Sequence, residues 1–178
     1  MSERLFIWKG TGEERTEAVL VDISDDRLLA RGTQIGLDPE PYELRYRLET
    51  GPGFVTELLQ LEAVGDGFRR TLELRRDVSV ELDGVPDCDI AFSPLTNTMP
   101  ILRHRLHERA GVRDFVMAWV SVPDLKVHSA GQRYEHLAAG LVRFATAEGD
   151  FTADLRVDAD GLLIDYPGLA RRLHPPGG

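Results

Sequence analysis

The chain has 178 residues, a length that favours a single domain over residues 1–178 with a hydrophobic core of its own. Lys and Arg number 21 and Asp and Glu number 30, so the formal net charge is −9, which argues against nucleic acid or an anionic lipid surface as a partner. The one cysteine, Cys88, excludes a disulfide within the chain, and no apolar run is long enough for a signal-peptide core or a membrane-spanning helix. These features predict a soluble cytoplasmic protein without an integral membrane segment.

Alternation of apolar and polar residues runs through most of the chain and predicts half-buried antiparallel strands. In YELRYRLE, residues 42–49, every second residue is apolar. The same pattern, clear or weak, predicts strands at 4–9, 15–23, 27–35, 54–63, 67–76, 78–83, 151–157 and 162–166. The clearest hairpin turn is DADG, residues 158–161, where Gly161 can adopt a positive φ.

Two later segments complete the predicted sheet. Residues 112–122 are apolar on both faces, which is typical of a strand covered on both sides. Residues 134–146 are rich in alanine, but Gly140 and the β-branched residues favour a strand over a helix. The sequence therefore predicts a mainly β fold of about ten strands, nearly all antiparallel.

The segment SPLTNTMPILRHR, residues 93–105, differs from these strands. It carries no charge before Arg103, and its two prolines make a long regular helix from Ser93 unfavourable. Its second half can form a short helix over residues 99–109, with Pro100 in the first turn and Gly111 ending it.

Thr96, Asn97 and Thr98 place several hydrogen-bond donors and acceptors side by side in this segment. Asn97 could bind a sugar hydroxyl, cap the helix or close a turn, and capping is the favoured interpretation.

Further along the chain, GQRYE and DYPGL offer another set of polar tips on apolar side chains. On a strand, Gln132 and Tyr134 share one face and Arg133 lies on the other, while the proline after Tyr166 holds that tyrosine extended. Such residues suit a site for an amphiphile or a carbohydrate, although ordinary strand packing explains them as well.

Two further pairs of residues have a spacing that could serve catalysis or metal binding. Asp87 and Asp89 are two residues apart, so on a strand they would share a face and could act as an acid and a base. His104 and His107 would share a helix face, but no HExxH or CxxC motif accompanies them. The sequence therefore predicts no metal site and no cofactor.

Four motifs carry a family resemblance. DCDIAFSPLTNTMPI at 87–101, VPDLKV at 122–127, QRY at 132–134 and VDADGLLIDYPGLARR at 157–172 follow one another in the order found in a family of bacterial proteins described as putative glycolipid-binding. The resemblance covers about residues 40–172. The chain departs from the family pattern at Leu95, where Phe is usual, and at Met99, where Leu is usual.

The resemblance implies a strongly curved antiparallel sheet, a half-barrel wrapped around one short helix, similar to bacterial lipoprotein-localisation carriers. It places residues 93–105 on the concave side, with the uncharged part buried and the Arg/His end emerging. Tyr46, Val120 and Leu155 are expected to line apolar walls. The expected ligand-binding residues are Asp89, Thr96, Asn97, Thr98, Arg103, Gln132, Arg133, Tyr134 and Tyr166.

Three functional hypotheses follow. The first is non-enzymatic binding of a small amphiphile, a glycolipid or a fatty acid, in the hollow of the sheet. The second is an enzyme of glycolipid metabolism that uses Asp87 and Asp89 as acid and base. The third is an interaction module that pairs through an exposed sheet edge.

Overall fold

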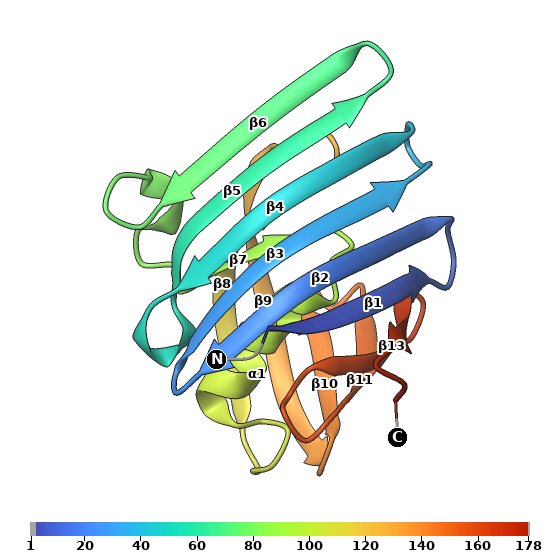
Figure 1. Ribbon diagram of the computed structural model, residues 1–178. Helices are drawn as coiled ribbons and strands as arrows, with labels where there is room; N and C mark the ends of the chain where they lie inside the picture. The colour runs from blue at the N-terminus through green and yellow to red at the C-terminus, as the bar shows by residue number, and fades with distance from the viewer. Residues whose placement is uncertain (1–2, 178) are drawn as a thin grey trace.

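Thirteen strands form one continuous sheet in the computed structural model, which describes residues 3–177 (Figure 1). Its strand order is β6-β5-β4-β3-β2-β1-β13-β12-β11-β10-β9-β8-β7. The strands are β1 (Arg4–Gly10), β2 (Arg15–Ser24), β3 (Arg27–Gly36), β4 (Tyr42–Thr50), β5 (Thr56–Gly65), β6 (Phe68–Arg75), β7 (Asp87–Ile90), β8 (Val112–Val120), β9 (Val127–Ala138), β10 (Leu141–Thr146), β11 (Thr152–Val157), β12 (Leu163–Tyr166) and β13 (Ala170–His174). The helix α1 (Thr98–His104) is short, and 3-10 turns occupy η1 (Pro52–Phe54), η2 (Val80–Leu82) and η3 (Leu95–Asn97).

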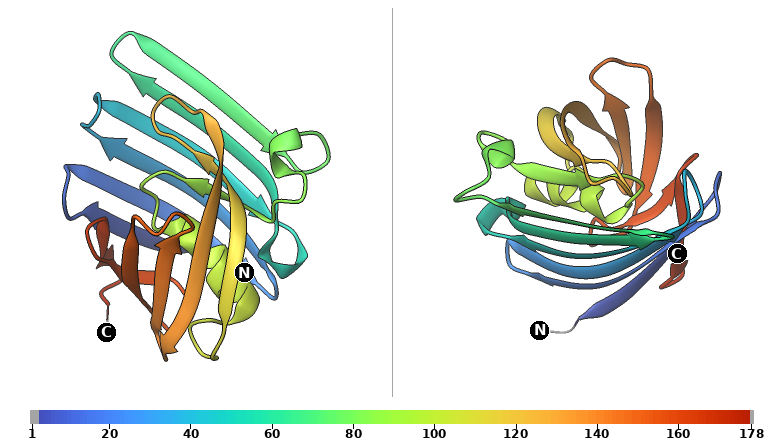
Figure 2. Two further views of the ribbon diagram at one scale, coloured as in Figure 1. Left: turned by 180° about the vertical axis from the view of Figure 1, so that it is seen from behind. Right: turned by 90° about the horizontal axis from the view of Figure 1, so that it is seen from above.

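The sheet is curved and open, and it returns over its own concave face. Strands β1 to β6 form a wide curved layer, and the strands from β11 to β7 lie across it with α1 in the hollow between them (Figures 1 and 2). The predicted mainly β, strongly curved sheet around one short helix is confirmed, with thirteen strands in place of about ten.

Period-two alternation is the physical origin of the wide layer. In β4 the side chains of Tyr42, Leu44, Tyr46 and Leu48 are buried. The alternate residues face solvent and form ion pairs along the strand, Arg45 with Glu43 and Arg47 with Glu49. Each strand therefore gives one face to the core and one to water.

One predicted strand, 78–83, is wrong. The chain turns after β6, where the backbone N–H of Ser79 donates to the carbonyl of Arg75 at 2.7 Å, and η2 follows. Val78 and Val80 are exposed and Leu82 alone of the three alternating apolar residues is buried, so the segment does not present one face to the core.

The segment 112–122 is covered on both faces only in its second half. Val112 and Val116 of β8 are exposed, whereas Met117, Ala118 and Val120 are buried. The reason is pairing: the last residues of β8 lie parallel to β7, which packs inside the fold. This parallel β7–β8 pair, connected through α1, is the exception to the antiparallel pairing of the described strands.

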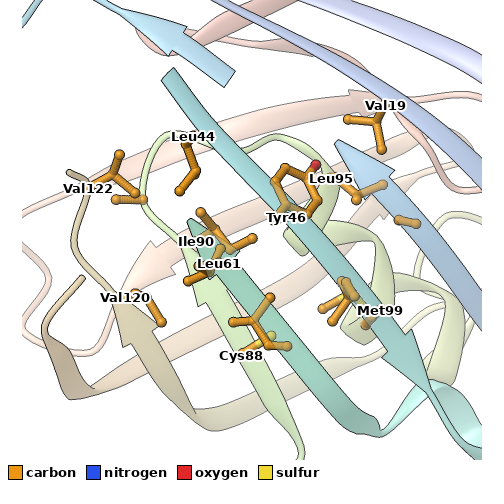
Figure 3. Close-up of a cluster of buried hydrophobic side chains, with 14 of the residues drawn as sticks. Val19, Leu44, Tyr46, Leu61, Cys88, Ile90, Leu95, Met99, Val120 and Val122 are labelled. Atoms are coloured by element: carbon orange, nitrogen blue, oxygen red, sulfur yellow. The ribbon is translucent and has the colours of Figure 1, made fainter. Parts of the chain in front are cut away.

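The core fills the space between the two layers. Cys88, Ile90 and Val120 pack with Leu44 and Leu61 of the wide layer (Figure 3). Cys88 is fully buried, as expected of a small apolar side chain.

Tyr46, Val120 and Leu155 were expected to line an open hollow. They are instead buried against other side chains of the protein, in two adjoining clusters. The hollow between the layers is therefore filled along these walls, and space for a ligand lies elsewhere.

Helix α1 is shorter than the predicted 99–109. Arg105 adopts a left-handed conformation, φ 52°, and its N–H bonds to the carbonyls of Ile101 and Leu102, which ends the helix at His104, well before Gly111. The uncharged residues from Ser93 to Ile101 are buried and the Arg/His end emerges, as the resemblance implied.

Candidate functional site

A cavity of about 370 Å³ is lined by β7 and the segment that follows it, together with residues of β8, β9, β10 and β12 and of the loops next to them. Four expected site residues line it: Asp89, Asn97, Gln132 and Tyr166. The remaining lining residues are Ile90, Ala91, Phe92, Ser93, Trp119, Ala130, Gly131, Phe144, Thr146, Glu148, Phe151 and Leu169. The cavity thus combines polar side chains from several elements with largely apolar walls.

Asp89 is the centre of the polar side. One carboxylate oxygen accepts a hydrogen bond from the Thr96 hydroxyl at 2.6 Å, and the other accepts one from the Gln132 side-chain amide at 2.6 Å. Burial raises the pKa of Asp89, and the nearby charge of Asp87 adds to the increase, while the two hydrogen bonds oppose it. A carboxylate has about four lone-pair sites, so Asp89 can still accept from a ligand.

Tyr134 connects the remaining polar residues from behind the cavity. Its hydroxyl lies 2.8 Å from Asn97 Oδ1 and 3.0 Å from Gln132 Oε1. Burial raises the pKa of Tyr134 well above its usual value, so the hydroxyl keeps its proton and donates to this pair of side chains.

Asn97 stands at the residue before α1, but its side chain makes no capping bond, so the favoured capping interpretation is wrong. The side chain turns instead toward Tyr134, because that hydroxyl is buried and needs a partner. Asn97 is therefore a buried polar connection between the segment before α1 and β9.

Replacing Asn97 with alanine is expected to lower the free energy of unfolding by about 0.5–1.5 kcal/mol, because the Tyr134 hydroxyl loses the nearer of its two buried acceptors and keeps Gln132. Urea unfolding of the variant measures this directly. Unchanged stability would mean that the amide contributes nothing to the fold.

The apolar wall is aromatic. Phe144, Phe151 and Tyr166 form a group with ring centroids 6.0 to 6.2 Å apart. Phe92 lines another part of the cavity, and Arg15 stacks over its ring, 3.6 Å from the centroid. Aromatic faces of this kind can contact either a sugar ring or an acyl chain.

Five of the nine expected site residues do not line this cavity. Arg103 binds the buried Asp87 and the carbonyls of Gly53 and Phe54. Arg133 is exposed and pairs with Asp114, 2.7 Å away, on the opposite strand face from Gln132 and Tyr134. Thr98 is fully buried, and its hydroxyl has no hydrogen-bond partner among residues 3–177. Thr96 and Tyr134 stand behind the lining and support it.

The residues that the sequence did not indicate are Trp119, Phe144, Phe151 and Glu148. Trp119 lies beside Asp89 because β7 and β8 pair in parallel with these two residues in register. A signal for this pairing would have to come from contacts between distant segments, since β7 is too short for periodicity.

Larger hollows lie elsewhere. One of about 480 Å³ at the other end of α1 is lined by Phe6, Leu102, Arg105 and His107 among others, and by none of the expected site residues. Another of about 630 Å³ is a groove that shares Gly131, Gln132 and Thr146 with the cavity. Size alone therefore does not select the site, and the cavity at Asp89 combines apolar walls with convergent polar groups.

Within the described chain, no group of three or more His, Cys, Asp or Glu side chains is placed to hold a metal ion. Nor does that part of the chain contain a helix long and apolar enough to cross a membrane.

Comparison with known proteins gives the family. A family model described as putative glycolipid-binding matches residues 5–172. The chain belongs to this family. The match extends beyond the motif-bearing part of the chain and includes β1 to β3. Membership supports a binding role in general.

A solved structure is also similar to this chain. It is a crystal structure of a DUF1089 family protein from Pseudomonas aeruginosa, with a TM-score of 0.75 and 29% sequence identity, covering 88% of this chain and 92% of that one. No curated protein matches the chain.

Proposed function

We propose that this protein binds a small amphiphile, a glycolipid or a fatty acid, in the cavity at Asp89. The observation that carries the proposal is the lining of that cavity, which combines the polar side chains of Asp89, Asn97 and Gln132 with the rings of Phe144 and Tyr166. A polar head would bond to the first group and an aliphatic chain would lie against the second. Each buried CH₂ contributes about 0.8 kcal/mol, so the chain would supply much of the affinity.

Acid–base catalysis by Asp87 and Asp89 has less support. Asp89 lines the cavity, but Asp87 is fully buried, bonds to Arg103 and is not part of the lining. A substrate in this cavity would meet one carboxylate of the pair. Binding without chemistry therefore remains the function that we propose.

The test is a calorimetric titration with a series of octyl amphiphiles: octyl glucoside, octanoate and octylamine. We expect saturable binding of at least one of them and none of free glucose, because the tail provides most of the affinity. Ala130 lines the cavity, and the Ala130→Phe variant should lose binding because the ring occupies the space.

The matched control is Ser129→Phe, since Ser129 directly precedes Ala130 on β9, is exposed and does not line the cavity. This variant should bind as the wild type does. If no amphiphile binds, or if Ala130→Phe binds normally, the proposed function is wrong.

A further inference from the structure

The cavity at Asp89 has an unusual charge composition. Among residues 3–177, its lining contains two charged side chains, Asp89 and Glu148, and no Arg, Lys or His. Three arginines that are not part of the lining have partners of their own: Arg15 pairs with Glu13 and stacks on the lining residue Phe92, Arg103 pairs with Asp87, and Arg133 pairs with Asp114. A ligand head in this cavity therefore meets negative charge and no positive charge.

The two aspartates on β7 differ in the charge of their hydrogen-bond partners. Asp87 is buried with a cation, because Arg103 donates two hydrogen bonds to its carboxylate. Asp89, two residues later, is bonded to Thr96 and Gln132, which are both uncharged. The protein thus compensates the charge of Asp87 internally and leaves that of Asp89 uncompensated, on the wall of a cavity.

The aromatic rings that line the cavity also favour a positively charged head. Trp119 lies in register with Asp89 on the neighbouring strand, and Phe144, Phe151 and Tyr166 line the cavity as well. The faces of aromatic rings attract cations, and the attraction grows when the cation is removed from water. Carboxylates together with aromatic faces are the surroundings in which proteins hold organic ammonium groups.

We infer that the head of the bound amphiphile carries a protonated amine, as in an amino sugar with an acyl tail or a long-chain amine. This inference rests on the proposed function and narrows it. The ammonium donates to the carboxylate of Asp89, with Glu148 adding negative charge at the loop that follows β10. An anionic head, such as that of a fatty acid, would face two carboxylates without a cation, and a neutral sugar would leave Asp89 uncompensated.

The octyl series tests the charge of the head with the tail held constant. At neutral pH we expect octylamine to bind at least about ten-fold more tightly than octyl glucoside, and octanoate more weakly than either. Asp89→Asn keeps the shape of the side chain and removes its charge, so it should lower the affinity for octylamine by about ten-fold and change that for octyl glucoside much less.

Two further variants provide a control and a second test of charge. Asp114→Asn removes a charge of the same kind from the exposed pair with Arg133 and should leave the preference intact. If Asp89→Asn does not fold, Glu148→Gln at an exposed loop position provides the same test of charge, with a smaller expected loss of octylamine affinity.

Equal or tighter binding of octyl glucoside or octanoate by the wild type would overturn this inference and leave the proposed function intact. A preference for octylamine that persists unchanged in both Asp89→Asn and Glu148→Gln would overturn it as well. Absence of binding by every octyl compound would overturn both.

Discussion

Replacing Arg103 with alanine is expected to lower the free energy of unfolding by about 3–5 kcal/mol, the usual cost of leaving a buried charge without its partner. Arg103 bonds to both oxygens of Asp87 and to the carbonyls of Gly53 and Phe54, at 2.7 and 3.0 Å. Asp87 is 0% exposed, so water cannot replace the guanidinium. Urea unfolding measures the loss.

Two variants separate this effect from a general loss of charge. Arg133→Ala breaks an exposed ion pair with Asp114 and should cost less than about 1 kcal/mol. Arg103→Met combined with Asp87→Leu removes both buried charges and should recover much of the stability. If Arg103→Ala unfolds at the same urea concentration as Arg133→Ala, Arg103 does not hold the fold together as described.

The second large effect concerns pH and Glu17. This residue of β2 is 2% exposed, and burial raises its pKa to about 7, although the hydroxyls of Tyr46 and Ser93 donate to it and oppose the shift. Between pH 4.5, its ordinary pKa, and about pH 7, the folded state keeps a proton that the unfolded chain has lost. Stability should therefore fall as the pH rises through this window, by about 3 kcal/mol for this group, and level off above it.

Glu17→Gln should remove most of this dependence and be more stable than the wild type at about pH 8, because the amide oxygen still accepts from Tyr46 and Ser93 without bearing a charge. Burial also raises the pKa values of Asp87 and Asp89, so some slope of the same sign should remain. Glu57→Gln, at an exposed position of β5, serves as control and should behave as the wild type does. If the stability of Glu17→Gln depends on pH as that of the wild type does, the ionisation of Glu17 is not the cause of the pH dependence.

The sequence predicted the parts of the fold that local pattern controls. Alternation over 42–49 corresponds to β4, because one face of that strand meets the core along its whole length. Gly161 has a φ of 76° in the turn after β11, as its place in DADG indicated. The burial of 93–101 was implied by the family resemblance and not by the local pattern.

The parts that the sequence missed depend on contacts between distant residues. Strand β7 has four residues, Asp87–Ile90, too few for a periodic signal, yet its parallel pairing with β8 brings Trp119 to the cavity. Arg103 was placed with the ligand because it follows the central motif, whereas its partner Asp87 lies 16 residues earlier in the chain. Such pairings between distant residues decide which polar side chains line a cavity. They also decide which polar side chains support the fold instead.

The most direct measurement of where the ligand binds is a crystal structure of the complex with the octyl amphiphile that binds most tightly in solution. We predict the head within hydrogen-bond distance of the Asp89 carboxylate and the tail against Phe144 and Tyr166. A ligand seated instead in the hollow lined by Arg105 and His107, with the cavity at Asp89 free of it, would contradict the proposed site.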